Sequence, residues 1–315
     1  MRNMFPKRIL RLEEINASAK SMPAAFMDRE DRRYYDELEN VTRTIALRLH
    51  DRCLVMLSGP SSSGKTTTAL LLRDCLRELG VDAHVVSLDN FYKGRGKAPV
   101  LEDGQYDYEA LEALNLPRLQ ACMLELIRDG ATQIPVFDFQ KGAPAQESQA
   151  LQIAHDSVVI FEGIHALNPV FEQHLPQENL FKIFINTISP IYAGDDKLLA
   201  RRHIRLVRRI LRDSRFRASP IENTLEMWPQ VVRGENMYMF PYVDTVDYVV
   251  DTTHAYEPCV FAREILPMLN SVEPSHPDYE TILHIRQALE RFEPIPAEDV
   301  PKGSLLREFL GGGIY

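Results

Sequence analysis

The residues best suited to chemistry form a phosphate-binding pattern. The run Gly59-Pro60-Ser61-Ser62-Ser63-Gly64-Lys65-Thr66, followed by Thr67, fits Gly-x-x-x-x-Gly-Lys-[Ser/Thr]. In this pattern the N–H groups of a glycine-rich loop hold phosphates at a helix start, where the helix dipole favours negative charge. The lysine reaches the outer phosphates, and the Thr66 hydroxyl binds Mg²⁺. The apolar run Cys53–Ser58 predicts the strand that must precede the loop, so we expect ATP and Mg²⁺ to bind at residues 59–67.

Two carboxylates follow other apolar runs. Asp89 comes directly after His84–Leu88, and Glu162 directly after Ser157–Phe161. A carboxylate at the end of an apolar strand is costly unless it is paired or binds a metal. Together with Thr66, these two residues could hold a hydrated Mg²⁺. Asp89 could also accept the proton of an attacking hydroxyl, as a base does in phosphoryl transfer.

The segment Ala200–Arg217 is dense in arginine within an acidic protein. Apolar residues recur through it at helical spacing, so we expect an amphipathic helix. Beside a phosphate-binding loop, guanidinium groups can close over phosphates and stabilise charge that spreads over a transferred phosphoryl group. The alternative interpretation is a solvated helix face without a ligand.

The elements that position these residues follow from five apolar runs, separated mostly by helical patterns. The runs are Cys53–Ser58, His84–Leu88, Ser157–Phe161, Phe181–Asn186 and Val246–Val250. Continuous apolar strands that alternate with helices predict an α/β fold, with a five-stranded parallel sheet and helices on both faces. Ligands in such sheets bind beyond the carboxyl ends of the strands, where the candidate residues stand.

Composition excludes several other classes of protein. The net charge of −9 over 315 residues gives no overall basic footprint for nucleic acid. No apolar run is long enough to span a membrane, and the N-terminus lacks the apolar core of a signal peptide. The four cysteines lack metal-ligand spacing, so we expect reduced thiols and a cytoplasmic protein.

In order and spacing, five stretches resemble the uridine kinase-like branch of the P-loop kinases, which includes the phosphoribulokinases. They are Leu57–Thr67, Ser87–Tyr92, Pro135–Phe139, Val159–Ile164 and Arg205–Asp213. The resemblance extends from about Arg52 to Thr253. It implies a P-loop NTPase fold and an ATP-dependent kinase acting on a hydroxyl of a small molecule. On this basis we expect an N-terminal helical extension at 1–50, a P-loop kinase domain at 51–270 and a C-terminal helical tail at 271–315.

The resemblance also implies individual roles for the catalytic side. Asp89 matches the catalytic base, and Glu162 matches a residue on the magnesium side. Arg209 and Arg212 match arginines over the acceptor and the phosphates, and Arg217 matches a further lid arginine. With Lys65 of the loop, these residues form the expected catalytic and ATP-binding set.

On the acceptor side, Glu109 falls where the family has an aspartate that binds ribose hydroxyls. Phe137 and Phe139 fall on aromatic positions that line the acceptor pocket, which Arg209 also borders. The departures from uridine kinases are concentrated here. The histidine that reads the pyrimidine is missing from residues 140–143, Phe137 replaces a tyrosine, Ala110-Leu111 replaces His-Pro, and Met227 replaces a glutamine. Because a site that hydrogen-bonds its substrate rejects analogues lacking those groups, we expect a changed acceptor, nucleoside-like or polyol.

Two classes of function stay open. The first is a small-molecule kinase with Asp89 as its base. The second is an ATP-binding regulatory NTPase that hydrolyses slowly and has no small-molecule acceptor. The presence of Asp89 favours the first, because a switch needs no base for an alcohol. An Asn-Lys-x-Asp motif for guanine is absent, while the preference between ATP and other triphosphates cannot be read from the sequence.

The ending Ser304–Gly313 resembles a bacterial subfamily that often carries a TGS-type domain before the P-loop. The residues before Gly59 are too few for such a domain, so we expect a short natural form or a truncated one. Related kinases often form homo-oligomers, and the sequence leaves the oligomeric state open. The expected partner is the small-molecule acceptor, with no membrane and no clear nucleic-acid footprint.

Overall fold

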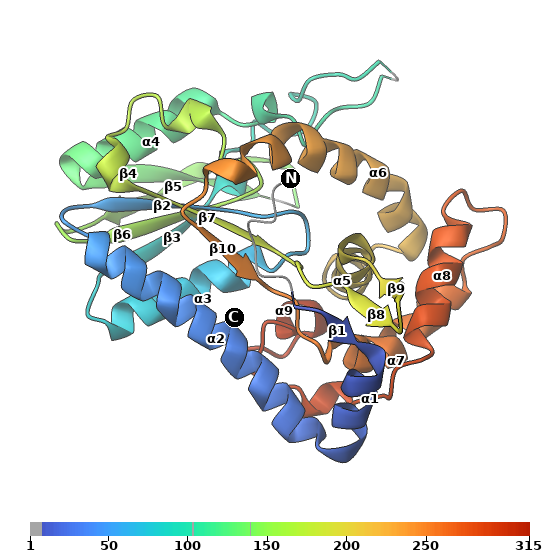
Figure 1. The fold of residues 1–315 in the computed structure, drawn as a ribbon. Coiled ribbons are helices and arrows are strands. Elements are labelled where there is room, and N and C mark those ends of the chain that lie inside the picture. The colour runs from blue at the N-terminus through green and yellow to red at the C-terminus, as the bar shows by residue number, and fades with distance from the viewer. Residues whose placement is uncertain (1–7, 103, 139) are drawn as a thin grey trace.

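A five-stranded parallel sheet forms the centre of the computed structural model, which describes residues 8–102, 104–138 and 140–315 (Figure 1). Its strand order is β10-β7-β2-β6-β3. In chain order the strands are β2 (Cys53–Ser58), β3 (Ala83–Ser87), β6 (Val158–Glu162), β7 (Leu180–Asn186) and β10 (Tyr248–Asp251). Each overlaps one predicted run, with its ends displaced by at most two residues. The predicted sheet is therefore confirmed.

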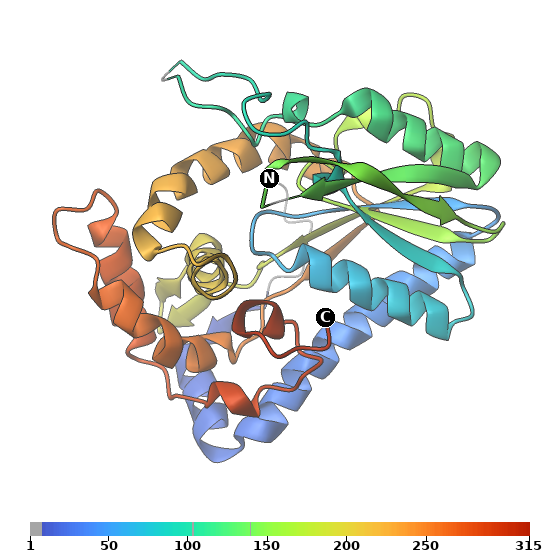
Figure 2. The same cartoon turned by 180° about the vertical axis from the view of Figure 1, so that it is seen from behind.

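Alternate residues of the central strands enter two separate hydrophobic cores. Val55 and Leu57 of β2 pack with α2 (Pro23–Arg48) and α3 (Lys65–Glu78). Leu54 and Met56 of the same strand pack with α4 (Leu116–Asp129) on the opposite face. Figures 1 and 2 show α2 and α3 on one side of the sheet and α4 on the other. Because successive strand residues point to opposite faces, an apolar strand of this kind must be covered twice, as predicted.

Two smaller sheets were not predicted from the sequence. One is the antiparallel hairpin of β4 (Ala131–Asp138) and β5 (Ala143–Gln152), which packs beside α4. The other joins β1 (Leu10–Arg11) to β8 (Ile191–Ala193) and β9 (Asp196–Leu199). Among the described residues, no helix is both long and apolar enough to cross a membrane.

A third hydrophobic core lies beside the sheet and is shared by both ends of the chain. It contains residues of α1 (Leu12–Ser21), α2 and the segments that follow β9. Those later helices are α5 (Arg201–Arg217), α6 (Ile221–Tyr238), α7 (Glu257–Asn270), α8 (Tyr279–Leu289) and the short α9 (Arg307–Leu310). Figures 1 and 2 show α1, α5, α7 and α8 grouped away from α4 and the hairpin. The division at residues 50 and 270 stays a prediction, since residues from all three parts share this core.

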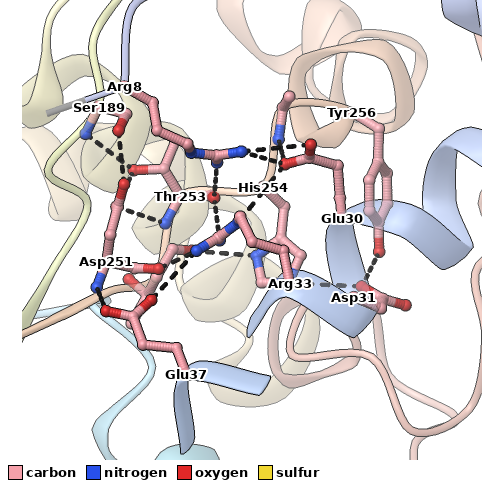
Figure 3. A network of polar contacts seen from close by, with 12 residues as sticks. Arg8, Glu30, Asp31, Arg33, Glu37, Ser189, Asp251, Thr253, His254 and Tyr256 are labelled. Atoms are coloured by element: carbon pink, nitrogen blue, oxygen red, sulfur yellow. Dashed lines mark hydrogen bonds and ion pairs between the residues drawn. The ribbon is translucent and has the colours of Figure 1, made fainter. Parts of the chain in front are cut away.

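A partly buried polar network ties the N-terminal part to the carboxyl edge of the sheet (Figure 3). Arg8 donates to Glu30 and to the Thr253 carbonyl, and Arg33 donates to the carbonyls of Asp251 and Thr253. The Asp251 carboxylate in turn accepts hydrogen bonds from the loop after β7 and from Thr253. The carboxyl edge of the sheet, which carries the candidate site, is therefore hydrogen-bonded to α2 through Arg33.

Candidate active site

The phosphate-binding loop has the strand–loop–helix geometry that its sequence predicts. Residues 59–64 connect β2 to α3, and Gly64 has φ +91°, a left-handed conformation that favours glycine. At Gly59 a Cβ atom would lie 2.4 Å from the Ile185 carbonyl oxygen, so a side chain does not fit. The Lys65 ammonium donates to the Pro60 carbonyl at 3.2 Å and folds back over the loop. The first N–H groups of α3 have no partners within the helix, which suits an anion.

Three neighbouring strands position Thr66, Asp89 and Glu162: Thr66 lies in the first turn of α3, after β2 and its loop, Asp89 follows β3, and Glu162 ends β6. Glu162 ends β6 opposite Ser87 of β3, and its Oε1 atom accepts from the Thr66 hydroxyl at 3.5 Å. Asp89 lies on the 3₁₀ turn Leu88–Phe91, where its N–H donates to the Ser87 hydroxyl at 3.3 Å. The structure therefore brings the predicted metal and base residues to one edge of the sheet.

The charges at this edge act on one another. Burial raises the pKa of Glu162 to about 7, and the Asp89 charge raises it further while Lys65 lowers it. Asp89 is exposed at the rim, yet surrounding protein atoms partly desolvate its carboxyl group and raise its pKa, against the opposing charges of Lys65, Arg217 and Arg212. Burial lowers the pKa of Lys65, and the carboxylates of Glu162, Asp89 and Glu308 oppose that shift.

This donor set fits Mg²⁺. Two carboxylates that repel each other, together with a hydroxyl, supply the hard oxygen ligands that the ion prefers. Within residues 8–102, 104–138 and 140–315, no three His, Cys, Asp or Glu side chains gather as metal ligands. A Mg²⁺ site needs no third carboxylate, because Mg²⁺ commonly keeps waters and substrate phosphates in its remaining positions.

The three predicted lid arginines share one carboxylate, Asp213. Its oxygens lie 3.2 Å from Arg209, 3.4 Å from Arg212 and 3.2 Å from Arg217. Arg209 also donates to the Ser61 hydroxyl at 2.7 Å, so it reaches the phosphate-binding loop directly. Arg217 is half-exposed. The predicted amphipathic helix is confirmed as α5, and Asp213 holds its cationic side chains together near the loop.

Two further arginines of α5 are structural supports of the loop, which sequence reasoning did not identify. Arg205 forms a fully buried ion pair with Glu235 of α6, at 2.6 Å, and donates to the Ser61 carbonyl. The backbone N–H of the same loop residue, Ser61, donates to the Glu235 carboxylate at 2.9 Å. Arg208 pairs with Glu257 at 2.7 Å and donates to the carbonyls of residues 62 and 63.

The predicted acceptor residues are only partly gathered. Burial raises the pKa of Glu109 to about 7, and the charge of the nearby Arg209 opposes that shift. Glu109 packs closely against Gly234 of α6. A Cβ atom added to Gly234 would lie 2.5 Å from the Cβ atom of Glu109. Phe137, on β4, packs against the Tyr92 ring with centroids 6.0 Å apart. Phe139 lies outside the described residues.

Tyr92 connects the two halves of this acceptor region. Its hydroxyl donates to the Tyr108 carbonyl at 3.3 Å, next to Glu109, while its ring meets Phe137. Burial raises the pKa of Tyr92 well above its usual range, and the charges of Asp89 and Glu109 raise it further. Tyr92 stands in the stretch Ser87–Tyr92 that carries the family resemblance, which is the only sequence signal that could have singled it out.

The chain is similar to known proteins over more than half of its length. The Phosphoribulokinase / Uridine kinase family matches residues 54–256, well over half of the chain. A uridine kinase of Mycoplasma genitalium is 28% identical over 57% of this chain and 75% of its own length. A uridine kinase of Lactobacillus johnsonii is 26% identical over 62% of this chain and 85% of its own length. A solved structure of a possible uridine kinase from Bacillus stearothermophilus aligns with a TM-score of 0.47 and 16% identity, over 69% of this chain and 98% of that one.

The family match spans β2 with its phosphate-binding loop, both carboxylate-bearing strand ends and the arginine helix α5. Members of this family are kinases that transfer phosphate to a hydroxyl group, which is the chemistry that a phosphate-binding loop beside two carboxylates supports. This chain belongs to the phosphoribulokinase / uridine kinase family and is a small-molecule phosphotransferase with an alcohol group as acceptor.

Proposed function

We propose that this protein transfers the γ-phosphate of Mg²⁺·ATP to a hydroxyl of a nucleoside-like or polyol acceptor, with Asp89 as the base. The observation that carries the proposal is the convergence at one sheet edge of Lys65, the Thr66–Glu162 contact of 3.5 Å, and Asp89. Lys65 is a point charge for the outer phosphates. Mg²⁺, when bound by Thr66, Glu162 and Asp89, would neutralise phosphate charge.

In the proposed step, Asp89 accepts the proton of the acceptor hydroxyl as its oxygen forms a bond to the γ-phosphorus. The bond between that phosphorus and the bridging oxygen of ADP breaks, so ADP leaves with the electron pair. Arg209 and Arg212 stand on the helix that faces the loop, where guanidinium groups stabilise charge on the transferred phosphoryl group. Lys65 acts on the same phosphates from inside the loop.

The acceptor class follows from Glu109 and its surroundings. A deprotonated Glu109 carboxylate accepts hydrogen bonds from vicinal hydroxyls, as in a ribose or a polyol. Tyr92 and Phe137 offer aromatic surface for a flat or apolar part of the acceptor. The base-reading groups of uridine kinases are missing at residues 110, 111, 137, 140–143 and 227, so uridine and cytidine should be poor acceptors.

An ADP-release screen across nucleosides, sugars and polyols tests the proposal. We expect at least one polyhydroxyl compound to stimulate ADP release in wild type and to lose that effect in Asp89→Asn. Slow ATP hydrolysis that no compound stimulates would support a regulatory NTPase instead. Uridine turned over with kcat/KM of ~10⁴ M⁻¹s⁻¹ or above would show that other residues read the base.

A further inference from the structure

The C-terminal segment 303–310 packs against the phosphate-binding loop and the helix that follows it. Ser304, Leu305, Leu306 and Phe309 are all buried. The Ser304 hydroxyl donates to Asp31 of α2 at 3.0 Å, the same Asp31 that Figure 3 shows below Tyr256. This hydrogen bond attaches the start of the segment to α2.

Its other end is held by the helices around the loop. The Phe309 ring packs edge-on against Phe261 of α7, with centroids 6.3 Å apart. The guanidinium of Arg208, which supports the loop, lies 5.0 Å from the centre of the same ring. At the first residue of the segment, Tyr35 of α2 donates to the Gly303 carbonyl. The segment is therefore attached to α2, α5 and α7, and its position relative to the loop is well defined.

Two residues of the segment touch the loop and the first turn of α3. Leu305 covers Gly64, where a Cβ atom would come within 2.7 Å of the Leu305 Cδ1 atom. Glu308 accepts a hydrogen bond from the Thr67 hydroxyl at 2.7 Å. Thr67 directly follows Lys65 and Thr66, so this carboxylate lies against the helix turn whose N–H groups attract phosphate.

A carboxylate and a nucleotide phosphate cannot both satisfy Thr67. The threonine hydroxyl has one O–H to donate, and Glu308 accepts it. Both groups are negatively charged, so a phosphate that approaches the first turn of α3 is repelled by the carboxylate in addition to finding the hydroxyl engaged.

We propose that Glu308 is a further residue of the donor-nucleotide site, where its carboxylate competes with a nucleotide phosphate for the Thr67 hydroxyl and so weakens donor binding. The inference rests on the proposed function, which places the donor at this loop. Glu308 acts through Thr67 and takes no part in the chemistry. Donor binding then requires the Glu308 carboxylate to leave Thr67, which loosens the last turn, Arg307–Leu310.

Glu308→Gln tests the charge while leaving a carbonyl oxygen for Thr67. By titration calorimetry with ATP, we expect the Kd to fall about tenfold or more at low ionic strength, and the gain to shrink as salt screens the repulsion. The KM for ATP should fall in the same way with little change in kcat. Glu298→Gln is the matched control, because Glu298 is an exposed carboxylate before the same segment and should leave ATP affinity unchanged. ATP affinity in Glu308→Gln that equals or falls below that of wild type overturns the inference.

Hydrogen exchange on the wild-type protein gives a second measurement that needs no variant. The backbone N–H groups of Leu310 and Gly311 donate to residues 306 and 307, so loosening of this turn is directly visible. Saturating ATP should speed exchange at residues 307–311 and not in α7. Slower or unchanged exchange there overturns the competition and makes the segment a fixed wall of the site. A wild-type protein that binds no ATP at all contradicts the proposed function itself, which separates the two failures.

Discussion

The buried ion pair between Arg205 and Glu235 makes the sharpest stability prediction, through the substitution Glu235→Ala. Both side chains are essentially inaccessible, at 1% and 0% exposure, and the carboxylate binds the guanidinium at 2.6 and 2.9 Å. Removal of the carboxylate leaves a charged guanidinium buried without a counterion. Loss of one partner of a buried pair costs about 3–5 kcal/mol, a large share of the ~5–15 kcal/mol that a typical domain has. The Ser61 N–H loses its acceptor in the same variant.

Urea unfolding followed by fluorescence measures this loss. Trp228 is the single tryptophan, and the Arg205 guanidinium lies 5.4 Å from the centre of its ring. The matched control is Glu39→Ala, which breaks an exposed pair with Arg43 and should cost less than about 1 kcal/mol. The double variant Arg205→Met/Glu235→Leu should recover most of the stability, because it leaves no buried charge. The double variant should still lower kcat, because the backbone N–H and carbonyl of Ser61 lose their side-chain partners. A loss below about 1 kcal/mol in Glu235→Ala would refute the reasoning.

Three further substitutions probe the site. Lys65→Ala should abolish acceptor phosphorylation and weaken ATP binding in calorimetry, because the outer phosphates lose a point charge; unchanged affinity would contradict this. Asp89→Asn should keep ATP affinity and lower kcat by about a hundredfold or more, whereas full activity would leave Asp89 only a structural role. Burial raises the pKa of Glu109 to about 7, so the folded state binds this proton more tightly than the unfolded state, and its stability falls as pH rises from about 4.5 through 7. Glu109→Gln should therefore match wild type near pH 4 and exceed it by about 2–3 kcal/mol at pH 8 in urea unfolding, and a pH-independent difference would argue against a buried, titrating Glu109.

The sequence predicted best what local patterns determine. The phosphate-binding loop needs a strand, two glycines and a helix start within a short span, and all of these are readable without knowledge of distant residues. The five strands were equally visible, because a strand buried on both faces is apolar throughout. The hairpin β4–β5 was missed because no residue of β5 is buried, so the strand has no core-facing apolar alternation to detect.

The supporting carboxylates were missed for a different reason. Glu235 meets Arg205 across 30 positions in the chain, and Glu308 meets Thr67 across 241. On its own helix each resembles an ordinary surface glutamate, and only the tertiary fold gives it a partner. Asp213 was noticed as part of a motif, yet its function of holding three arginines also requires the folded α5. The proposed acceptor residues were predictable only as positions, because Glu109 and Phe137 come from separate segments of the chain.

Transfer of label from ATP tests the central claim most directly. The protein is incubated with Mg²⁺ and ATP radiolabelled at the γ-phosphate, together with a panel of nucleosides, sugars and polyols that includes uridine. Kinase function with Asp89 as base predicts label on the hydroxyl of at least one acceptor other than uridine, in amounts that match the ADP formed, and loss of that transfer in Asp89→Asn. Label found only in inorganic phosphate, with every acceptor and at equal rates in both proteins, would contradict it.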